Sequence, residues 1–236
     1  MKFEVVIMVE ITWLGHACFL ITGIKKVLID PFLSGNPTAA RKPEEVEAEF
    51  ILVTHGHGDH VGDAELIAKR CNAKLICIYE LSRYFAKKGV ESIGMNIGGT
   101  VNFEGVSFTM VPAVHSADVE DGGEIISAGN PVGFVISMDG VKIYHTGDTF
   151  VFSDMQLIAK LYKPEVMLLP IGGFYTMGIE EAYRALQLVK PKVAVPMHYN
   201  TFPVIQQDPE KFKKLVESKL KVRVAALKPG ESLKYP

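Results

Sequence analysis

The chain has 236 residues, 48% of them hydrophobic, which is enough apolar material for a sizeable core. Its formal net charge at pH 7 is −2 and its basic residues form no long run, which argues against non-specific binding to nucleic acid or acidic membranes. The three cysteines, Cys18, Cys71 and Cys77, are odd in number and form no CxxC motif. We therefore expect reduced thiols and a cytoplasmic location.

The N-terminal segment is too short and too polar to be a signal peptide or a membrane span. Its apolar residues are interrupted by Glu4 and Glu10. We interpret residues 1–10 as the beginning of a first strand. Met8 is an alternative start to Met1, because the interpretable alternation begins just after it.

Two short strands are predicted over residues 9–14 and 18–22, and a hairpin turn leads into a third strand that ends at Pro31. His16 lies at the break between the first two strands, where side chains often reach a site. It either contacts substrate and transfers a proton or is a structural histidine with its hydrogen bonds satisfied. Asp30 either orients a metal-bound histidine or is a plain turn residue at the strand end.

The densest metal-ligand chemistry follows the apolar run 50–53, which predicts a central strand covered on both faces. Imidazole and carboxylate groups suit Zn, Fe or Mn, and the motif has no cysteine for a thiolate zinc site. Gly56 and Gly58 would let the backbone turn sharply enough to aim neighbouring side chains at one point. Four ligands in one turn, with more candidates downstream, predict an open, catalytic and dinuclear centre. The four are His55, His57, Asp59 and His60.

Scaffold elements are predicted after the motif. Asp63 is expected to cap the first of two helices, and the remaining segments are strands. The predicted helices cover residues 64–70 and 81–88, and the predicted strands cover 74–78, 100–103 and 106–112.

His115 follows a strand and stands at the mouth of the long polar loop 116–131. A loop of this length in a compact domain is typical of a lid or a binding loop. Its acidic side chains would repel a polyanion at the entrance. They are Asp118, Glu120, Asp121 and Glu124.

The second half repeats the alternation of strands and helices. Strands are predicted over 132–138, 141–144, 166–171, 193–196, 222–226 and 232–235, and helices over 154–161, 179–189 and 212–220. Two of these strands run into polar stretches that contain His145, Asp148 and His198. The loop 172–177 either forms the wall of a pocket or is an ordinary entry into a helix. Candidates for substrate contact are Tyr175, Tyr199, Asn200 and His16. We expect one domain over residues 1–236, built from two similar halves at 1–110 and 111–236.

At this point the chain resembles the metallo-beta-lactamase superfamily, whose His-x-His-x-Asp-His motif is matched at residues 55–60. The resemblance spans nearly the whole chain, because the later ligands of the family follow in order. It implies an α/β fold, a four-layer αββα sandwich with two mixed sheets between outer helices. By position it also implies one metal on His55, His57 and His115, a second on Asp59, His60 and His198, and Asp148 as the bridge.

Two other segments narrow the resemblance. Residues 13–17, Trp-Leu-Gly-His-Ala, and the pair Asp30-Pro31 look like the branch that includes ascorbate-6-phosphate lactonase, the N-acyl-phosphatidylethanolamine phospholipase D and many uncharacterised bacterial metal-dependent hydrolases. The zinc beta-lactamases proper usually have a cysteine where Asp148 stands. The flavin-linked di-iron relatives carry a glutamate in the first motif and an attached flavodoxin domain, and neither feature fits this chain.

The expected function is hydrolysis of a small ester, lactone or phosphoester with two divalent metal ions, Zn, Mn or Fe. A hydroxide bridging the metals would attack the substrate, with Asp59 orienting it and His16 assisting. A nuclease is disfavoured by the acidic loop, and a non-catalytic metal-binding regulatory module is the third interpretation. The expected partner is a small molecule, without nucleic acid or membrane. The sequence does not decide the substrate, the metal or the role of His145. It is compatible with a monomer and with a homo-oligomer.

Overall fold

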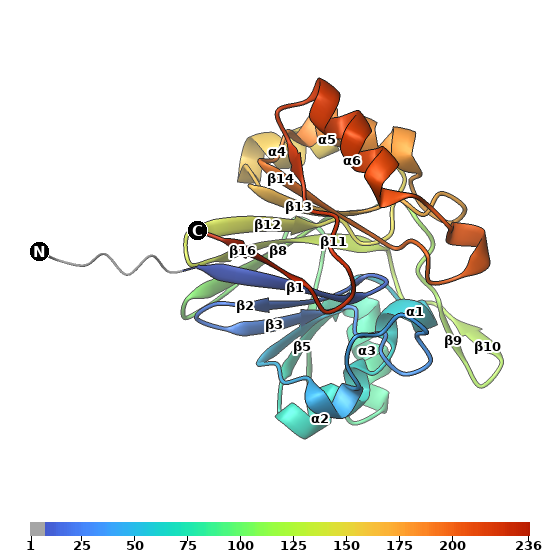
Figure 1. The fold of residues 1–236 in the computed structure, drawn as a ribbon. Coiled ribbons are helices and arrows are strands. Elements are labelled where there is room, and N and C mark those ends of the chain that lie inside the picture. The colour runs from blue at the N-terminus through green and yellow to red at the C-terminus, as the bar shows by residue number, and fades with distance from the viewer. Residues whose placement is uncertain (1–7) are drawn as a thin grey trace, which may run out of the picture.

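The computed structural model describes residues 8–236, so the part of the predicted first strand within 1–7 lies outside the described residues. Two seven-stranded sheets face each other, and helices cover the outer side of each (Figure 1). Both sheets contain parallel and antiparallel pairs. This αββα arrangement confirms the predicted fold class.

The first sheet has the strand order β16-β1-β2-β3-β4-β5-β6. Its pairs are antiparallel from β16 to β3 and parallel from β3 to β6. The helices α2 and α3 cover its outer face (Figure 1). The bounds are β1 Val9–Gly15, β2 Cys18–Thr22, β3 Lys26–Ile29, β4 Phe50–Leu52, α2 Ala64–Cys71, β5 Lys74–Ile78, α3 Tyr79–Lys87, β6 Ser92–Met95 and β16 Ser232–Tyr235.

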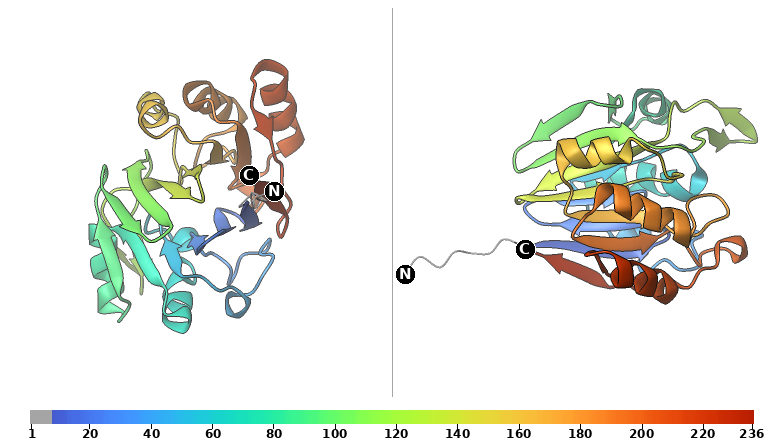
Figure 2. Two further views of the ribbon diagram at one scale, coloured as in Figure 1. Left: turned by 90° about the vertical axis from the view of Figure 1, so that its left-hand side faces the viewer. Right: turned by 90° about the horizontal axis from the view of Figure 1, so that it is seen from above.

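The second sheet has the order β15-β14-β13-β12-β11-β8-β7. Its pairs are antiparallel from β7 to β12 and parallel from β12 to β15. The helices α4, α5 and α6 cover its outer face (Figures 1 and 2). The bounds are β7 Thr100–Phe103, β8 Val106–Pro112, β11 Val132–Met138, β12 Val141–His145, α4 Met155–Tyr162, β13 Val166–Pro170, α5 Ile179–Val189, β14 Val193–Met197, α6 Pro209–Lys219 and β15 Arg223–Val224.

The inner faces of the two sheets form one contiguous apolar core. β4 and β13 are buried along their whole length, as expected for strands covered on both faces. Large side chains such as Phe19, Phe108 and Phe134 fill the space between the layers. A core of this kind fixes the ends of the strands, and the loops beyond those ends carry the polar motifs. They lie at the edge marked by α1 (Gly58–Val61), opposite the C-terminus (Figure 1).

Three features of the fold differ from the sequence predictions. β6 was not predicted, because it is only four residues long and contains Gly94, which disfavours a strand, although Ile93 and Met95 alternate with Ser92 and Gly94. The loop 116–131 contains a small hairpin, β9 (Val119–Asp121) paired with β10 (Glu124–Ile126). The division into halves at residue 110 is wrong, since β7 and β8 belong to the second sheet and β16 returns to the first.

The predicted cap of α2 is also wrong in its chemistry. Asp63 occupies the N-cap position, but its side chain makes no capping hydrogen bond. Its carboxylate instead accepts from the backbone N–H groups of Leu33 and Ser34, which have no strand partners there. Asp208 is a true cap, because it accepts from Glu210 N at the start of α6.

Within residues 8–236, every helix is too short or too polar to cross a lipid bilayer.

Candidate metal centre

Four strands deliver the predicted ligands to one edge of the sandwich. The motif at 55–60 follows β4, His115 follows β8, Asp148 follows β12 and His198 follows β14. In the described residues, every group of three or more side chains that could hold a metal ion is drawn from these seven residues together with His16. The structure therefore brings all seven sequence-predicted ligands to one place.

The first cluster consists of three imidazoles from two loops. The ring atoms His55 Nε2 and His57 Nδ1 lie 3.0 Å apart, a separation that two ligands of one ion can have. The His115 ring centroid lies 5.2 Å from that of His55 and 5.1 Å from that of His57. These three side chains could hold one metal ion together.

The second cluster combines a carboxylate with two buried imidazoles. Asp59 Oδ2 lies 3.8 Å from His198 Nε2 and 4.0 Å from His60 Nε2. The rings of His60 and His198 are nearly parallel, with centroids 5.6 Å apart. These atoms leave room for a second ion next to the first cluster.

Asp148 stands between the two clusters. Its Oδ2 atom lies 2.9 Å from His198 Nε2 and 3.3 Å from His60 Nε2 on one side. On the other side the same atom lies 3.7 Å from His115 Nε2. A carboxylate in this position could bind one ion from each cluster at once.

Unpartnered polar atoms show that these residues suit a metal ion. Among residues 8–236, five buried side-chain nitrogen or oxygen atoms lack a hydrogen-bond partner, and four of them belong to this centre. They are His60 Nε2, Asp148 Oδ1 and both ring nitrogens of His198. Burying such atoms without a partner is costly, and two divalent ions would supply a partner for His60 Nε2, His198 Nε2 and Asp148 Oδ1. The N and O donor set is also the one that borderline divalent metals prefer.

The electrostatics of the two clusters differ. Burial, with the nearby His60, holds the pKa of His55 well below its usual value, and burial also lowers the pKa of His57 and of His115. Burial alone would lower the pKa of His198 too, but the Asp148 carboxylate outweighs it and raises this pKa to about 9. The first cluster is thus prepared as neutral imidazoles, whereas His198 holds a proton that a metal would displace.

Asp30 fixes the ring orientation of one histidine in each cluster. Its carboxylate accepts from His60 Nδ1 at 2.8 Å and from Thr54 Oγ1 at 2.7 Å. Because the Thr54 hydroxyl donates to Asp30, it must accept from His55 Nδ1, 3.0 Å away. His55 therefore presents an unprotonated Nε2 to the centre, which is the atom that a metal needs. The Asp148 and Asp30 carboxylates raise the pKa of His60 against the effect of burial, so the His60 Nε2 becomes available when a metal displaces its proton. Of the two interpretations of Asp30, the structure supports the orienting one.

His16 is completely buried behind Asp59 rather than in contact with open space. Its Nε2–H donates to Asp59 Oδ2 at 3.0 Å, and its Nδ1 accepts from Thr201 Oγ1 at 2.9 Å. The ring also packs on His198, with centroids 4.0 Å apart. Both nitrogens are therefore engaged, and the side chain reaches the site through Asp59.

The backbone at the centre is held in an unusual conformation. His16 and His198 both have φ of 54°, a left-handed value that is uncommon for residues other than glycine. The His198 N–H donates to the His16 carbonyl oxygen, which also accepts from Trp13 Nε1. These bonds join β1 to the end of β14 and stabilise the strained residues, as often observed at functional sites.

His145 is a structural histidine. Its Nε2–H donates to the carbonyl oxygen of Ala17, and its Nδ1 accepts from the N–H of Gly147. Gly147 itself has φ of 63°, and a Cβ there would lie 2.5 Å from the Val132 carbonyl oxygen. His145 therefore positions the turn before Asp148 without belonging to a metal cluster.

The two glycines of the motif have different roles. A Cβ on Gly56 would lie 2.3 Å from the Ala117 carbonyl oxygen, so the close approach of these two loops requires glycine. Gly58 begins α1 with open space around it and no positive φ. Neither glycine has the positive φ of a sharp turn, so glycine is needed at residue 56 for the close approach of the loops, and the structure shows no such need at residue 58.

A cavity of about 520 Å³ lies over the centre. Its lining combines metal-ligand candidates with side chains that the sequence did not single out. Of the predicted substrate contacts, Tyr175 lines this cavity. The complete lining is His57, Asp59, His115, Ser116, Asp148, Tyr175, His198, Phe202 and Val204.

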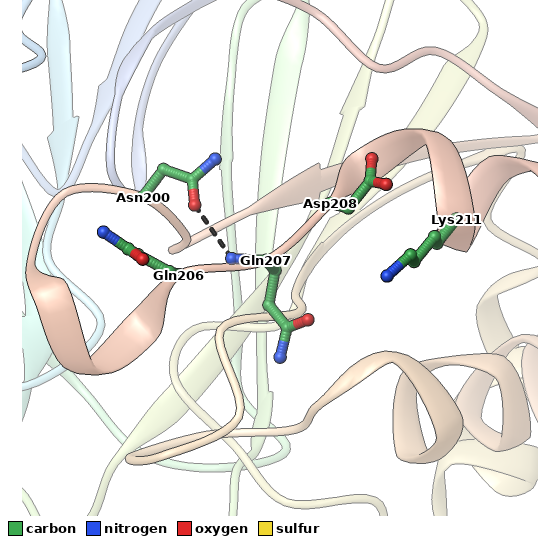
Figure 3. A pocket seen from close by; sticks show the side chains of 5 residues that line it. All are labelled: Asn200, Gln206, Gln207, Asp208 and Lys211. Atoms are coloured by element: carbon green, nitrogen blue, oxygen red, sulfur yellow. Dashed lines mark hydrogen bonds between the residues drawn. The ribbon is translucent and has the colours of Figure 1, made fainter.

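Tyr199 and Asn200, also predicted as substrate contacts, lie elsewhere. Tyr199 is buried and stacks on Trp13, with ring centroids 5.3 Å apart. Asn200 lines a separate hollow with Gln206, Gln207 and Lys211, where its Oδ1 accepts from the backbone N–H of Gln207 (Figure 3). β14 ends at Met197, and beyond it His198 and Asn200 both have left-handed backbone, with φ of 54° and 61°. The chain therefore turns sharply after His198, and Tyr199 and Asn200 do not line the cavity over the centre.

The acidic loop is partly neutralised within the molecule. Asp121 lies 2.8 Å from Lys88 Nζ and accepts from Tyr84 OH, so it pairs with α3. Asp118 accepts from the N–H of Ala128 and lies near His57, whose pKa it raises slightly against burial. Ser116 Oγ lies 3.2 Å from His57 Nε2. The loop therefore contributes Ser116 to the cavity and leaves Asp118 as the acidic group beside it.

Comparisons with known proteins place this geometry in context. Residues 10–198 match the family model described as a beta-lactamase superfamily domain. A UPF0173 metal-dependent hydrolase of Archaeoglobus fulgidus is 65% identical over 96% of this chain and 99% of its own length. The structure of Igni18, a metallo hydrolase of Ignicoccus hospitalis, is 39% identical with a TM-score of 0.89 and covers 97% of this chain and 99% of that one.

A more distant neighbour is similar in fold alone. The isothiocyanate hydrolase from Delia radicum gut bacteria is 18% identical with a TM-score of 0.76, and the match covers 96% of this chain and 98% of that chain.

Proposed function

Because the chain belongs to the metallo-beta-lactamase superfamily and is one of its metal-dependent hydrolases, we propose that it hydrolyses a small ester, lactone or phosphoester at a centre of two divalent ions. The observation that carries the proposal is the position of Asp148 between two ligand clusters, under an open cavity. A structural site would be closed by its ligands, whereas here a small molecule has direct access to both clusters.

The side chains of the site have three roles, which are to bind the metal ions, to contact the attacking water and to hold Asp59 in place. His55, His57 and His115 would hold one ion, and Asp59, His60 and His198 the other, with Asp148 shared. When bound, the ions would supply Lewis acidity and lower the pKa of a water molecule toward about 7. Asp59 lines the cavity and is positioned to accept a hydrogen bond from the attacking water. His16 acts on the reaction through Asp59, whose carboxylate it holds.

Two rival functions are less well supported. A nuclease needs cationic side chains along the path of a polyanion, and no Lys or Arg among residues 8–236 lines this cavity. Tight binding of RNA or DNA at physiological salt, with a steep salt dependence, would favour the nuclease. A purely regulatory metal-binding module would not need the open cavity, and catalytic turnover of any compound would argue against it.

The test is turnover by metal-reconstituted protein. We expect the protein loaded with Zn, Mn or Fe to hydrolyse at least one compound in a panel of lactones, phosphodiesters, thioesters and activated esters. The Asp148→Asn variant, which keeps the size of the side chain, is the matched control and should lose this activity. An equal rate for both proteins would assign the activity to a contaminant and contradict the proposal.

The proposal includes a cytoplasmic location and a small-molecule partner. Cys18 and Cys77 are buried free thiols, and burial raises the pKa of each, so they are unreactive and suited to a reducing compartment. Cys71 is also free.

A further inference from the structure

The cavity over the metal centre has two unlike walls. One wall consists of the polar ligand candidates, and the other of the apolar side chains Tyr175, Phe202 and Val204. Val204 belongs to the short helix η2 (Pro203–Ile205), and Phe202 comes just before it, in the segment that follows His198. The same segment that supplies a ligand therefore also supplies two of the three apolar side chains.

This apolar wall continues onto the protein surface. Phe174 is 68% exposed, Tyr175 56% and Val204 50%. Phe174 packs edge-on against Tyr175, with ring centroids 4.7 Å apart. Large apolar side chains exposed together at the mouth of a cavity commonly mark a surface that a ligand covers.

The loop that carries these aromatic residues is fixed by the backbone. Gly173 N–H donates to the Met177 carbonyl oxygen, and Met177 N–H donates to the carbonyl oxygen of Thr149. Thr149 directly follows Asp148. The aromatic residues are therefore tied to the loop of the proposed bridging ligand, and their place at the mouth follows from the fold.

The cavity provides no cationic side chain, among the described residues, for an anionic group that lies away from the reacting bond of a substrate. Among the described residues its charged lining groups are the carboxylates of Asp59 and Asp148 and the histidines, without any Lys or Arg. The proposed metal ions would bind these carboxylates and histidines. A phosphate or carboxylate away from the reacting bond would therefore lose its hydration without gaining a cationic partner.

We infer that the substrate carries an uncharged apolar group, an acyl chain or an aryl ring, next to the bond that is hydrolysed. This inference rests on the proposed hydrolase function and narrows its substrate class. The apolar group lies along Phe202 and Val204 toward Phe174, and the reacting carbonyl lies over the metal centre. Water adds across the acyl–oxygen bond, so the ester gives a carboxylic acid and an alcohol.

A graded ester series tests the inference. For metal-reconstituted protein, kcat/KM on p-nitrophenyl acetate, butyrate, hexanoate and octanoate should rise by about three- to fourfold for each methylene that the apolar wall covers. The hemisuccinate ester, whose acyl group ends in a carboxylate, should react more slowly than the butyrate. A flat series, or a preference for the hemisuccinate, would overturn the inference while leaving the proposed hydrolase function in place.

A binding measurement keeps the test independent of turnover. Straight-chain alkyl hydroxamic acids bind metal ions and are not esters, so their affinity reports the apolar wall even if no ester is hydrolysed. We expect their affinity for the metal-loaded protein to rise with chain length by a similar factor. If a second copy of this chain covers the apolar surface instead, it competes with the hydroxamate for that surface. Diluting the protein would then separate the two copies and strengthen binding of the longest hydroxamate. That result would also contradict the inference.

Matched substitutions locate the effect. Val204→Lys places a cation on the wall and should flatten the chain-length series while raising activity on the hemisuccinate ester. Leu161→Lys, at a 61% exposed position on α4, adds the same charge away from the cavity and should leave both series unchanged. Equal behaviour of the two variants would show that the wall does not contact the substrate.

Discussion

The imidazole of His16 donates from Nε2 to Asp59 Oδ2 at 3.0 Å, and it does so from a position of 0% exposure. Thr201 binds the opposite ring nitrogen, so the three side chains form a chain that ends on a proposed metal ligand. Asp59 is the most accessible member, with 29% of its side chain exposed. The relationship gives His16 a positioning role that can be separated from direct proton transfer.

Removing His16 should weaken the second metal site more than the first. In the His16→Ala variant Asp59 loses its buried partner, and we expect affinity for the second ion to fall by about 10- to 100-fold, the usual effect of losing a group that orients a ligand. Affinity for the first ion should stay within about twofold, the precision of such a comparison between variants. Metal titration by calorimetry measures both steps.

Substitutions of Thr201 provide the control for this prediction. Thr201→Ser keeps the hydroxyl group and should behave as the parent protein, whereas Thr201→Val should reproduce part of the loss. If His16→Ala keeps both affinities and loses about 10²- to 10⁴-fold in rate, His16 is instead a general acid or base, as one interpretation of the sequence proposed.

The places where ligands emerge from the strands were predictable from sequence for a local reason. Strands such as β4 and β13 are apolar throughout, and their polar continuations mark the places where ligands emerge. The position of His55 and Asp148 at strand ends follows from this pattern, whereas the αββα class and the complete ligand set were implied by the family resemblance. The partner of His16 could not be predicted, because Asp59 is 43 residues away and only the packed sheets bring them together.

Two of the three side chains of the apolar wall could not be predicted for a similar reason, whereas Tyr175, in the loop 172–177, was a predicted substrate contact and does line the cavity. Phe202 lies in an irregular segment and Val204 in the three-residue helix η2, and in segments this short neither a period of two nor a period of 3.6 indicates which side chain faces a cavity. Tyr199 and Asn200 directly follow His198 in the sequence, yet the left-handed backbone at His198 and Asn200 turns the chain, and neither side chain lines the cavity. β6 escaped prediction because a four-residue strand that contains Gly94 gives a weak signal, although Ile93 and Met95 keep a period of two.

Asp148 should control the number of bound ions. We expect about two divalent ions per chain in metal-reconstituted protein, because seven N and O ligands exceed what one site can use. Asp148→Ala removes the shared carboxylate and should lower the occupancy of both sites. Elemental analysis provides the count, and Asp154→Ala, at an exposed aspartate on the protein surface, is the control that should bind as the parent does. A parent protein with no more than one equivalent would contradict the dinuclear centre.

Metal binding at neutral pH should release protons from the second cluster. The Asp148 carboxylate raises the pKa of His198 to about 9 against the effect of burial, so this imidazole is protonated in metal-free protein at neutral pH. A bound ion needs the neutral ring, and affinity for the second ion should therefore fall as pH decreases below about 9. His55, His57 and His115, with lowered pKa values, should release none.

Calorimetry in two buffers of different ionisation enthalpy measures the proton count of each binding step. The two steps should differ, with release of at least one proton for the second ion. A binding heat that is independent of the buffer for both ions would show that His198 is neutral before metal binds.

Asp30 should determine the metal affinity of both clusters through the orientation of His55 and His60. It is fully buried and accepts from Thr54 N, Thr54 Oγ1 and His60 Nδ1. In Asp30→Asn the amide group has the same size but replaces one accepting oxygen with an N–H donor, which cannot accept from His60. The His60 ring should then carry its proton on Nε2, the atom that faces the centre. We expect affinity for the second ion to fall by about 10- to 100-fold, and the free energy of unfolding of metal-free protein to fall by about 1.5 to 3 kcal/mol.

The control is Asp63→Asn, at a carboxylate that accepts from the backbone of Leu33 and Ser34 away from the ligands. It should lower the melting temperature without changing either metal affinity. If Asp30→Asn also leaves both affinities unchanged, the bond from Asp30 to His60 supports the fold only, and the tautomers at the centre are set by the metals themselves.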